Sequence, residues 1–171
     1  PYELKEGKDI FTIPAVNILY FYIQFLINPN LYYQRFFELM TMEPFSINPH
    51  DYKILWEEKS KYKDVLDCLK NAPLEKFEQP QKFKDFLDTY EYLKDYKSRE
   101  NIKNTILEIG SKTGIFNYYI NGDINKYENI LALKTFLDEA KGFCEVNKTS
   151  FIEEFYNYIE TIKADDDAIM T

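Results

Sequence analysis

Glycine and valine are scarce in this 171-residue chain, which contains only five glycines. β-Sandwiches, β-barrels and doubly wound α/β folds need glycine at their turns and β-branched residues in their strands. This composition therefore argues against all three architectures. Hydrophobic residues make up 45% of the chain and aromatic residues 18%, which is enough for a substantial core in one domain. We expect an all-α fold.

Histidine and cysteine, which dominate catalytic and metal sites, are almost absent. His50 is the single histidine, so a catalytic triad has no base paired with a nucleophile, and we expect His50 at the surface of a helix start. Cys68 and Cys144 lack the spacing of a zinc site. We interpret them as reduced thiols and predict a cytoplasmic location. We therefore predict no catalytic, metal-binding or cofactor-binding residue in this chain.

Two short motifs are incomplete versions of known ligand loops. Gly110 to Gly114 contains serine and lysine but lacks the spacing of a phosphate-binding loop, so we interpret it as a helix end. Asp165 to Asp167 lacks the alternating ligands and the glycine of a calcium loop, and we interpret it as a solvated linker.

Basic residues are also fewer than acidic ones: the chain has 21 basic and 29 acidic residues, and its net charge is −8. Autonomous nucleic-acid-binding domains usually carry a basic surface, so strong phosphate binding by this chain alone is disfavoured. A local basic cluster at 94–103 is interleaved with acidic residues, which is typical of a solvated face. No run reaches the about 20 apolar residues of a membrane span, so we expect no membrane partner.

The longest apolar run, Ile13 to Asn28, organises the rest of the chain. Pro14 suits the first turn of a helix, and Asn28-Pro29 suits its end. The residues between them are apolar on almost every side of a helix, which is typical of burial on several sides. We predict a buried central helix around which the others pack.

Start and stop signals divide the remainder into further helices, for a total of about eight. A second helix over Leu31 to Met42 is expected to turn four apolar residues inward: Leu31, Phe36, Leu39 and Met40. Asn48 is a good N-cap with Pro49 at the first helical position, so they begin a third helix.

The second half of the chain continues the helical pattern. A long helix is predicted from Pro80 to Tyr96, and Ser98 is expected to cap the next one. Asp123 is expected to cap another long helix. Ser150 and Glu153 form a capping-box pattern at the start of the last helix.

Both ends of the sequence look like short strands. We expect residues 1–171 to form a single helical domain with strand stubs at 1–5 and 168–171. Two stubs around a helical block are typical of a domain inserted into the sheet of another protein. Since the sequence starts without Met and stops abruptly at Thr171, we expect an excised fragment.

The residues at the two ends carry a resemblance to a known family. The ending DDAIMT at 166–171 resembles the stretch of UvrD/Rep-type superfamily 1 DNA helicases, including the AddA and RecB branch, that leads directly into a helicase motif. Pro1 to Leu4 is similar to the strand after which those chains leave the second motor domain. Four interior segments resemble parts of the helical 2B insertion of that family: 13–30, 106–119, 129–133 and 150–155.

The resemblance implies that the chain is an accessory 2B subdomain of a DNA helicase with a helical fold. The implied partners are duplex or junction DNA and the remaining motor domains of the parent protein. ATP and Mg²⁺ would be bound by the parent, so the fragment itself is expected to have no cofactor and no catalysis. Its implied role is to pivot on its two connections and orient the duplex.

One departure concerns the loop that grips DNA in several members of the family. Their helix-hairpin-helix has a Gly-Ile-Gly pattern, whereas the corresponding segment here, Phe45 to Pro49, has no glycine. Close approach of this backbone to a phosphate is therefore less available. Ser46, Asn48, His50 and Lys53 are the residues that we predict to contact DNA if this region does so.

Two other functions remain open. An acidic, aromatic-rich helical chain also suits a free-standing protein–protein interaction module, which an exposed apolar patch would favour. A small helical enzyme would require a pocket with convergent titratable groups.

Overall fold

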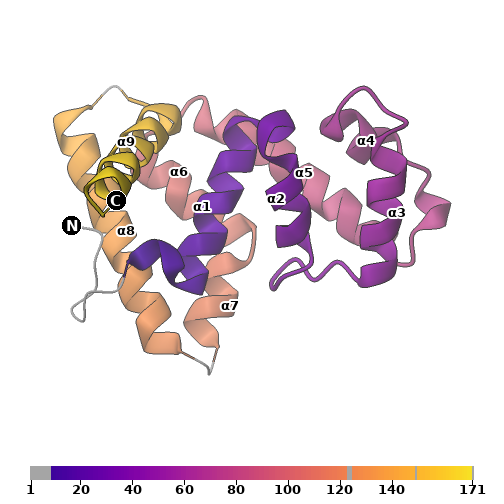
Figure 1. The fold of residues 1–171 in the computed structure, drawn as a ribbon, viewed down its shortest axis with the longest axis horizontal. Helices are drawn as coiled ribbons and strands as arrows, with labels where there is room; N and C mark the ends of the chain where they lie inside the picture. The colour runs from indigo at the N-terminus through magenta and orange to yellow at the C-terminus, as the bar shows by residue number, and fades with distance from the viewer. Residues whose placement is uncertain (1–8, 123–124, 149, 171) are drawn as a thin grey trace.

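The computed structural model describes residues 9–122, 125–148 and 150–170, and helices dominate that part of the chain (Figure 1). The elements in chain order are η1 (Ile10–Thr12), α1 (Pro14–Ile27), α2 (Pro29–Met40), α3 (Pro49–Lys59), α4 (Val65–Asn71), η2 (Leu74–Lys76), α5 (Pro80–Lys97), α6 (Ile102–Lys112), α7 (Ile115–Asn121), α8 (Lys126–Val146) and α9 (Ile152–Met170). The predicted all-α fold is confirmed. None of the described helices is both long and apolar enough to cross a membrane.

Helix α1 is the buried centre that the apolar run predicted. Its side chains are buried around most of the circumference, including Tyr22, Phe25 and Leu26, whereas Asn17 and Phe21 are partly buried. Helices α2, α5, α7, α8 and α9 all contact it. A helix that is apolar on almost every side loses most of its contact with water only when neighbours surround it, and these five helices supply that cover.

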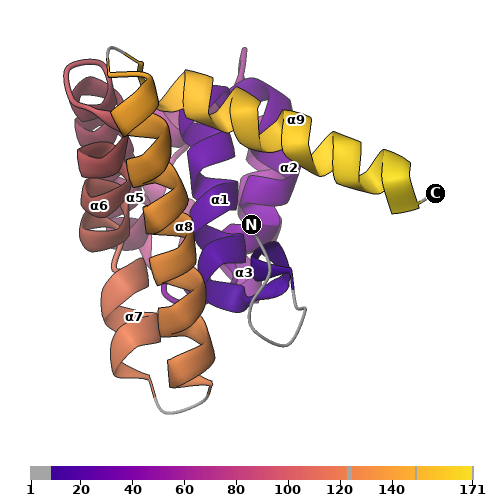
Figure 2. The ribbon, with the colours of Figure 1, turned by 90° about the vertical axis from the view of Figure 1, so that its left-hand side faces the viewer.

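The helices are arranged as two flanks joined by the central ones. Figure 1 shows α3 and α4 on one flank and α8 and α9 on the other, with α1, α2 and α5 between them and α7 below α1. Figure 2 shows α6 and α8 running side by side. The loop between α2 and α3 therefore lies where the first flank meets the centre.

Proline and asparagine set several helix boundaries as predicted. Pro14, Pro29, Pro49 and Pro80 each occupy the first turn of a helix. A proline in the first turn loses no hydrogen bond, because the N–H groups there have no partner within the helix. Asn28 ends α1, and its side chain accepts the N–H of Leu31 at 3.2 Å.

The predicted inner face of α2 is partly wrong. Leu39 and Met40 are buried as expected, but Leu31 is 66% exposed. Nine residues separate Leu31 from Met40, which is about two and a half helical turns, so the two side chains face opposite sides. Phe37 supplies the buried ring instead, whereas the side chain of Phe36 lies outside the described part.

Two predicted caps are also displaced. Ser98 lies at the C-terminus of α5, and Asn101 caps α6 by accepting the N–H of Asn104 at 2.8 Å. At α9 only the glutamate half of a capping box forms, one residue later than predicted: the N–H of Phe151 donates to the Glu154 carboxylate at 2.8 Å, and the Phe151 side chain has no acceptor to offer in return. Glu153 forms an ion pair with Lys97 of α5, which explains why it does not cap.

The predicted strand stubs have different outcomes. The stub at 1–5 lies outside the described residues, as does the predicted cap Asp123. Residues 168–170 belong to α9, which also runs through the expected linker at 165–167. A strand needs a neighbouring strand for its backbone hydrogen bonds, whereas a helix satisfies its own. The described chain offers no such neighbour, so the helix continues.

Candidate functional site

The segment 41–53 and the hollow beside it form the candidate site. The loop after α2 folds back on that helix, because the N–H of Ile47 donates to the carbonyl of Met40 at 2.8 Å. Ser46 adopts a left-handed conformation with φ of 52°. The carbonyl oxygen of Ser46 accepts a hydrogen bond from the ammonium of Lys82 on α5, at 2.9 Å. These bonds fix the loop between α2 and α5.

Asn48 and Asp51 anchor the first turn of α3. The side chain of Asn48 accepts the N–H of Asp51 at 2.8 Å, which is the predicted N-cap. The carboxylate of Asp51 is fully buried and accepts the N–H groups of Glu78 and Gln79 at 2.8 and 2.9 Å. Asp51 therefore ties α3 to the segment that begins α5.

The buried Asp51 carboxyl is held in its charged form. Burial on its own would raise the pKa of Asp51, but the N–H groups of Glu78 and Gln79 and the ring of His50 favour the anion. The pKa therefore lies below its usual value. Sequence reasoning missed this residue: an acid in the first turn of α3 was visible, but its partners 27 and 28 positions away were not.

His50 lies beside acidic groups. Its Nδ1 is 3.1 Å from Asp51 Oδ1 and 3.6 Å from Glu78 Oε1. Asn48 also donates to Glu78, at 3.2 Å. Two of the four predicted DNA-contacting residues thus face a carboxylate, which repels phosphate. Lys53 is exposed on the outer side of α3 and offers its charge to solvent.

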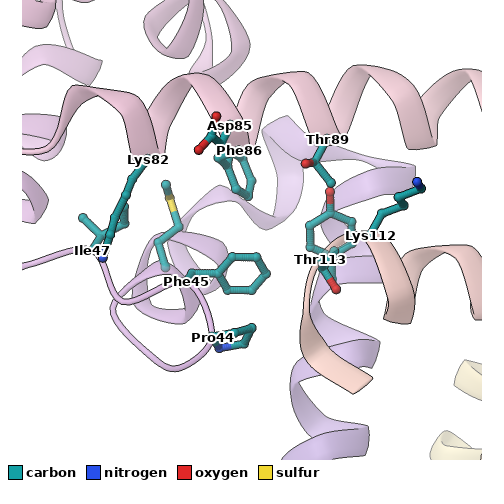
Figure 3. A pocket seen from close by; sticks show the side chains of 11 residues that line it. Pro44, Phe45, Ile47, Lys82, Asp85, Phe86, Thr89, Lys112 and Thr113 are labelled. Carbon is teal, nitrogen blue, oxygen red and sulfur yellow. The ribbon is translucent and has the colours of Figure 1, made fainter. Parts of the chain in front are cut away.

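The hollow beside this segment has a volume of about 240 Å³ and lies between the loop after α2, α5 and the end of α6. Figure 3 shows Lys82 beside Ile47 at one end, with Lys112 beyond Thr89 and Thr113 at the other. Apolar residues form most of its wall and polar ones its rim: Tyr22, Met40, Pro44, Phe45, Ile47, Phe86, Lys82, Asp85, Thr89, Lys112 and Thr113.

The chemistry available at the site is that of binding. Among the described residues no group of three His, Cys, Asp or Glu side chains is placed to hold a metal ion. His50 is oriented by Asp51, which is half of a catalytic constellation, but within the described part of the chain its ring has carboxylates as neighbours rather than a nucleophilic hydroxyl or thiol. Cys68 is buried and its pKa is raised to about 11 by burial, which leaves its thiol protonated.

Comparison with known proteins identifies no relative. No protein-family model, no curated protein and no solved structure matches the chain.

Proposed function

We propose that the chain is an accessory 2B-type subdomain of an ATP-dependent superfamily 1 DNA helicase. One observation carries the proposal: the segment that enters α1 lies against α9. The ammonium of Lys163 is 4.6 Å from the ring centroid of Phe11 and 4.8 Å from that of Tyr20. A helical body whose entering segment lies against its last helix suits insertion between neighbouring strands of a parent sheet. The order of the family-like segments along the sequence supports the same proposal.

The proposed role is the one that a 2B subdomain has in this helicase family. The parent motor would bind ATP and Mg²⁺ and hydrolyse the nucleotide, while this subdomain orients the duplex ahead of it. Among the four residues predicted to contact DNA, Lys53 is the lysine, and its side chain is exposed to solvent. With Glu78 beside Asn48 and His50, we expect only a weak duplex contact, in keeping with the net charge of −8.

The test is binding of the chain to a fluorescent duplex with a 3′ single-stranded tail, over a series of salt concentrations. We expect a dissociation constant on the order of micromolar at low salt that weakens steeply as salt rises. Lys53→Glu should weaken binding and lower the salt slope by about one or more. Lys134→Glu, an exposed lysine on α8, is the matched control and should weaken it far less. Absence of binding at low salt, or equal effects of both variants, would exclude the contact.

An exposed apolar patch at the turn between α8 and α9 favours a second candidate, a protein–protein interaction module. Val146 is 83% exposed, and Phe151 and Tyr158 are also exposed. The ring centroids of Phe143 and Tyr158 lie 5.0 Å apart, so the patch is continuous across both helices. Retention of a partner by the chain but not by a Val146→Asp variant, together with no duplex binding, would favour this candidate.

A further inference from the structure

The aromatic wall of the cavity offers a flat surface for a ring. Phe45 is partly buried, and its ring lies nearly parallel to that of Tyr22, with centroids 6.1 Å apart and an angle of 11°. Phe86 meets Phe45 edge-on at 6.0 Å. These two neighbours hold the Phe45 ring in place, and Figure 3 shows it directed into the space below α5. A planar ligand can stack on such a fixed ring.

Helix α5 supplies a row of polar groups above this wall. Lys82, Asp85 and Thr89 follow at intervals of three and four, which places them on one face of the helix. Asp85 Oδ1 accepts the side-chain amide of Gln81 at 2.8 Å, and Lys82 donates to the Ser46 carbonyl at 2.9 Å. These bonds hold both side chains while leaving one carboxylate oxygen and two ammonium protons for a ligand.

The size and the mouth of the cavity restrict the ligand further. A volume of about 240 Å³ is smaller than the roughly 300–1,000 Å³ of clefts for drug-sized molecules, so it suits a single ring system. Lys112 lies at the end of the cavity away from Lys82, and Figure 3 shows its side chain directed outward from Phe45. Its ammonium is 5.5 Å from the centroid of the Tyr92 ring. A negative group attached to the ring would meet this cation while staying in contact with water.

We propose that this cavity binds one nucleotide. The base stacks on Phe45, and its edge donates to Asp85 while accepting from Lys82 or Thr89. Its phosphate meets Lys112. Nucleobases present donors and acceptors side by side, which matches a carboxylate next to an ammonium. The same chemistry is offered by a free nucleoside monophosphate and by an unpaired nucleotide of a single strand. The proposal is independent of the duplex contact at Lys53.

The experiment titrates the whole chain with two sets of probes, by calorimetry and by ligand-observed NMR. The first set is the four deoxynucleoside monophosphates with their phosphate-free nucleosides, and the second is single-stranded hexamers of one base each. We expect the monophosphates to bind more tightly than the nucleosides. Hexamers that bind more tightly per site than the monophosphates identify a strand as the source, whereas the reverse order identifies the free nucleotide.

Three variants locate the contacts. Lys112→Gln should remove the difference between nucleotide and nucleoside, and Asp85→Asn should change the order of preference among the bases. Phe45→Leu should weaken every nucleotide by roughly fivefold or more, because base–aromatic stacking is lost. Lys112 and Asp85 lie at the rim, so their variants keep the test valid if Phe45→Leu fails to fold.

Lys103→Gln is the matched control, since Lys103 is an exposed lysine at the other end of α6. It should leave nucleotide binding unchanged. The proposal is overturned if no monophosphate or hexamer binds at millimolar concentration, or if Lys103→Gln and Lys112→Gln weaken binding equally. Neither result affects the duplex assay with Lys53→Glu, so the two proposals fail separately.

Discussion

Ser46 makes the turn before α3 without the conformational freedom of glycine. Its φ of 52° lies in the left-handed region, where a residue with a Cβ is strained by about 1–2 kcal/mol. Its Oγ is buried and finds no hydrogen-bond partner among the described residues.

Replacing Ser46 with glycine should therefore stabilise the protein. We expect Ser46→Gly to raise the free energy of unfolding by about 0.5–1 kcal/mol, because the strain is relieved at a modest cost in backbone entropy. Urea unfolding followed by circular dichroism measures the change. Ser98→Gly is the control. Ser98 has a φ of −78°, in the right-handed region, so glycine relieves no strain there and should lower the free energy of unfolding. A loss of stability in both variants would contradict the strain at Ser46.

Asp51 should make part of the protein's stability depend on acid. Because its folded-state pKa is lowered, its contribution is fully present above the unfolded pKa of about 3.9 and is lost as pH falls through the folded value. Asp51→Asn should cost about 1–3 kcal/mol at neutral pH, since an amide cannot accept both N–H groups as well. It should also flatten the acid limb of a plot of unfolding free energy against pH. Asp88→Asn, an exposed acid on α5, should do neither.

At the scale of elements, α9 is held on α1 and α2 by a network of tyrosines. The hydroxyl of Tyr156 lies 2.7 Å from that of Tyr32, accepts the Gln24 amide at 3.3 Å and donates to Glu160 at 3.3 Å. Glu160 also accepts the hydroxyl of Tyr20 at 2.6 Å. Burial raises the pKa of Tyr156, so the hydroxyl keeps its proton for donation. The network joins three helices around one phenol.

Removing that hydroxyl should loosen α9. We expect Tyr156→Phe to lower the free energy of unfolding by about 1–2 kcal/mol, because several buried partners lose a hydrogen bond. Hydrogen exchange should increase most in α9. Tyr158→Phe, on the exposed side of the same helix, should change stability by less than about 0.5 kcal/mol. Equal effects of the two substitutions would exclude a structural role for the network.

Sequence signals predicted elements better than the contacts between them. The prolines at 14, 29, 49 and 80 begin helices as expected, because proline acts on its own backbone. The orientation of Leu31 and the partner of Glu153 depend on which helix lies opposite, and periodicity does not contain that information. At the candidate site, the cap at Asn48 was predictable, whereas the bonds of Asp51 to Glu78 and Gln79 were not.

At the scale of the whole molecule, the central helix is completed by a distant residue. Ile13, at the N-cap of α1, offers no side-chain cap, and Asn129 of α8 supplies it by accepting the N–H of Ala15 at 3.1 Å. Asn129 is buried and lies 114 positions from Ala15.

Asn129→Ala should destabilise the entire fold rather than one helix. We expect a loss of about 1–3 kcal/mol, because a buried N–H at the start of α1 is left without its acceptor. The urea midpoints measured by tryptophan fluorescence and by circular dichroism should fall together. Asn157→Ala on the exposed face of α9 is the control. Two separate transitions in Asn129→Ala would show that α1 and α8 do not unfold as one unit.

The position of α1 also has a consequence for synthesis on the ribosome. The most apolar helix of the body leaves the exit tunnel early, whereas α8 and α9, which cap and cover it, are made more than 100 residues later. At about 5–20 residues per second, α1 waits on the order of 5–20 s for them. During that time α2 and the other helices made before α8 cover only part of α1, and the apolar side that α8 and α9 cover stays exposed on the nascent chain. We therefore expect chaperones that shield this side of α1 on the ribosome to raise the yield of folded protein.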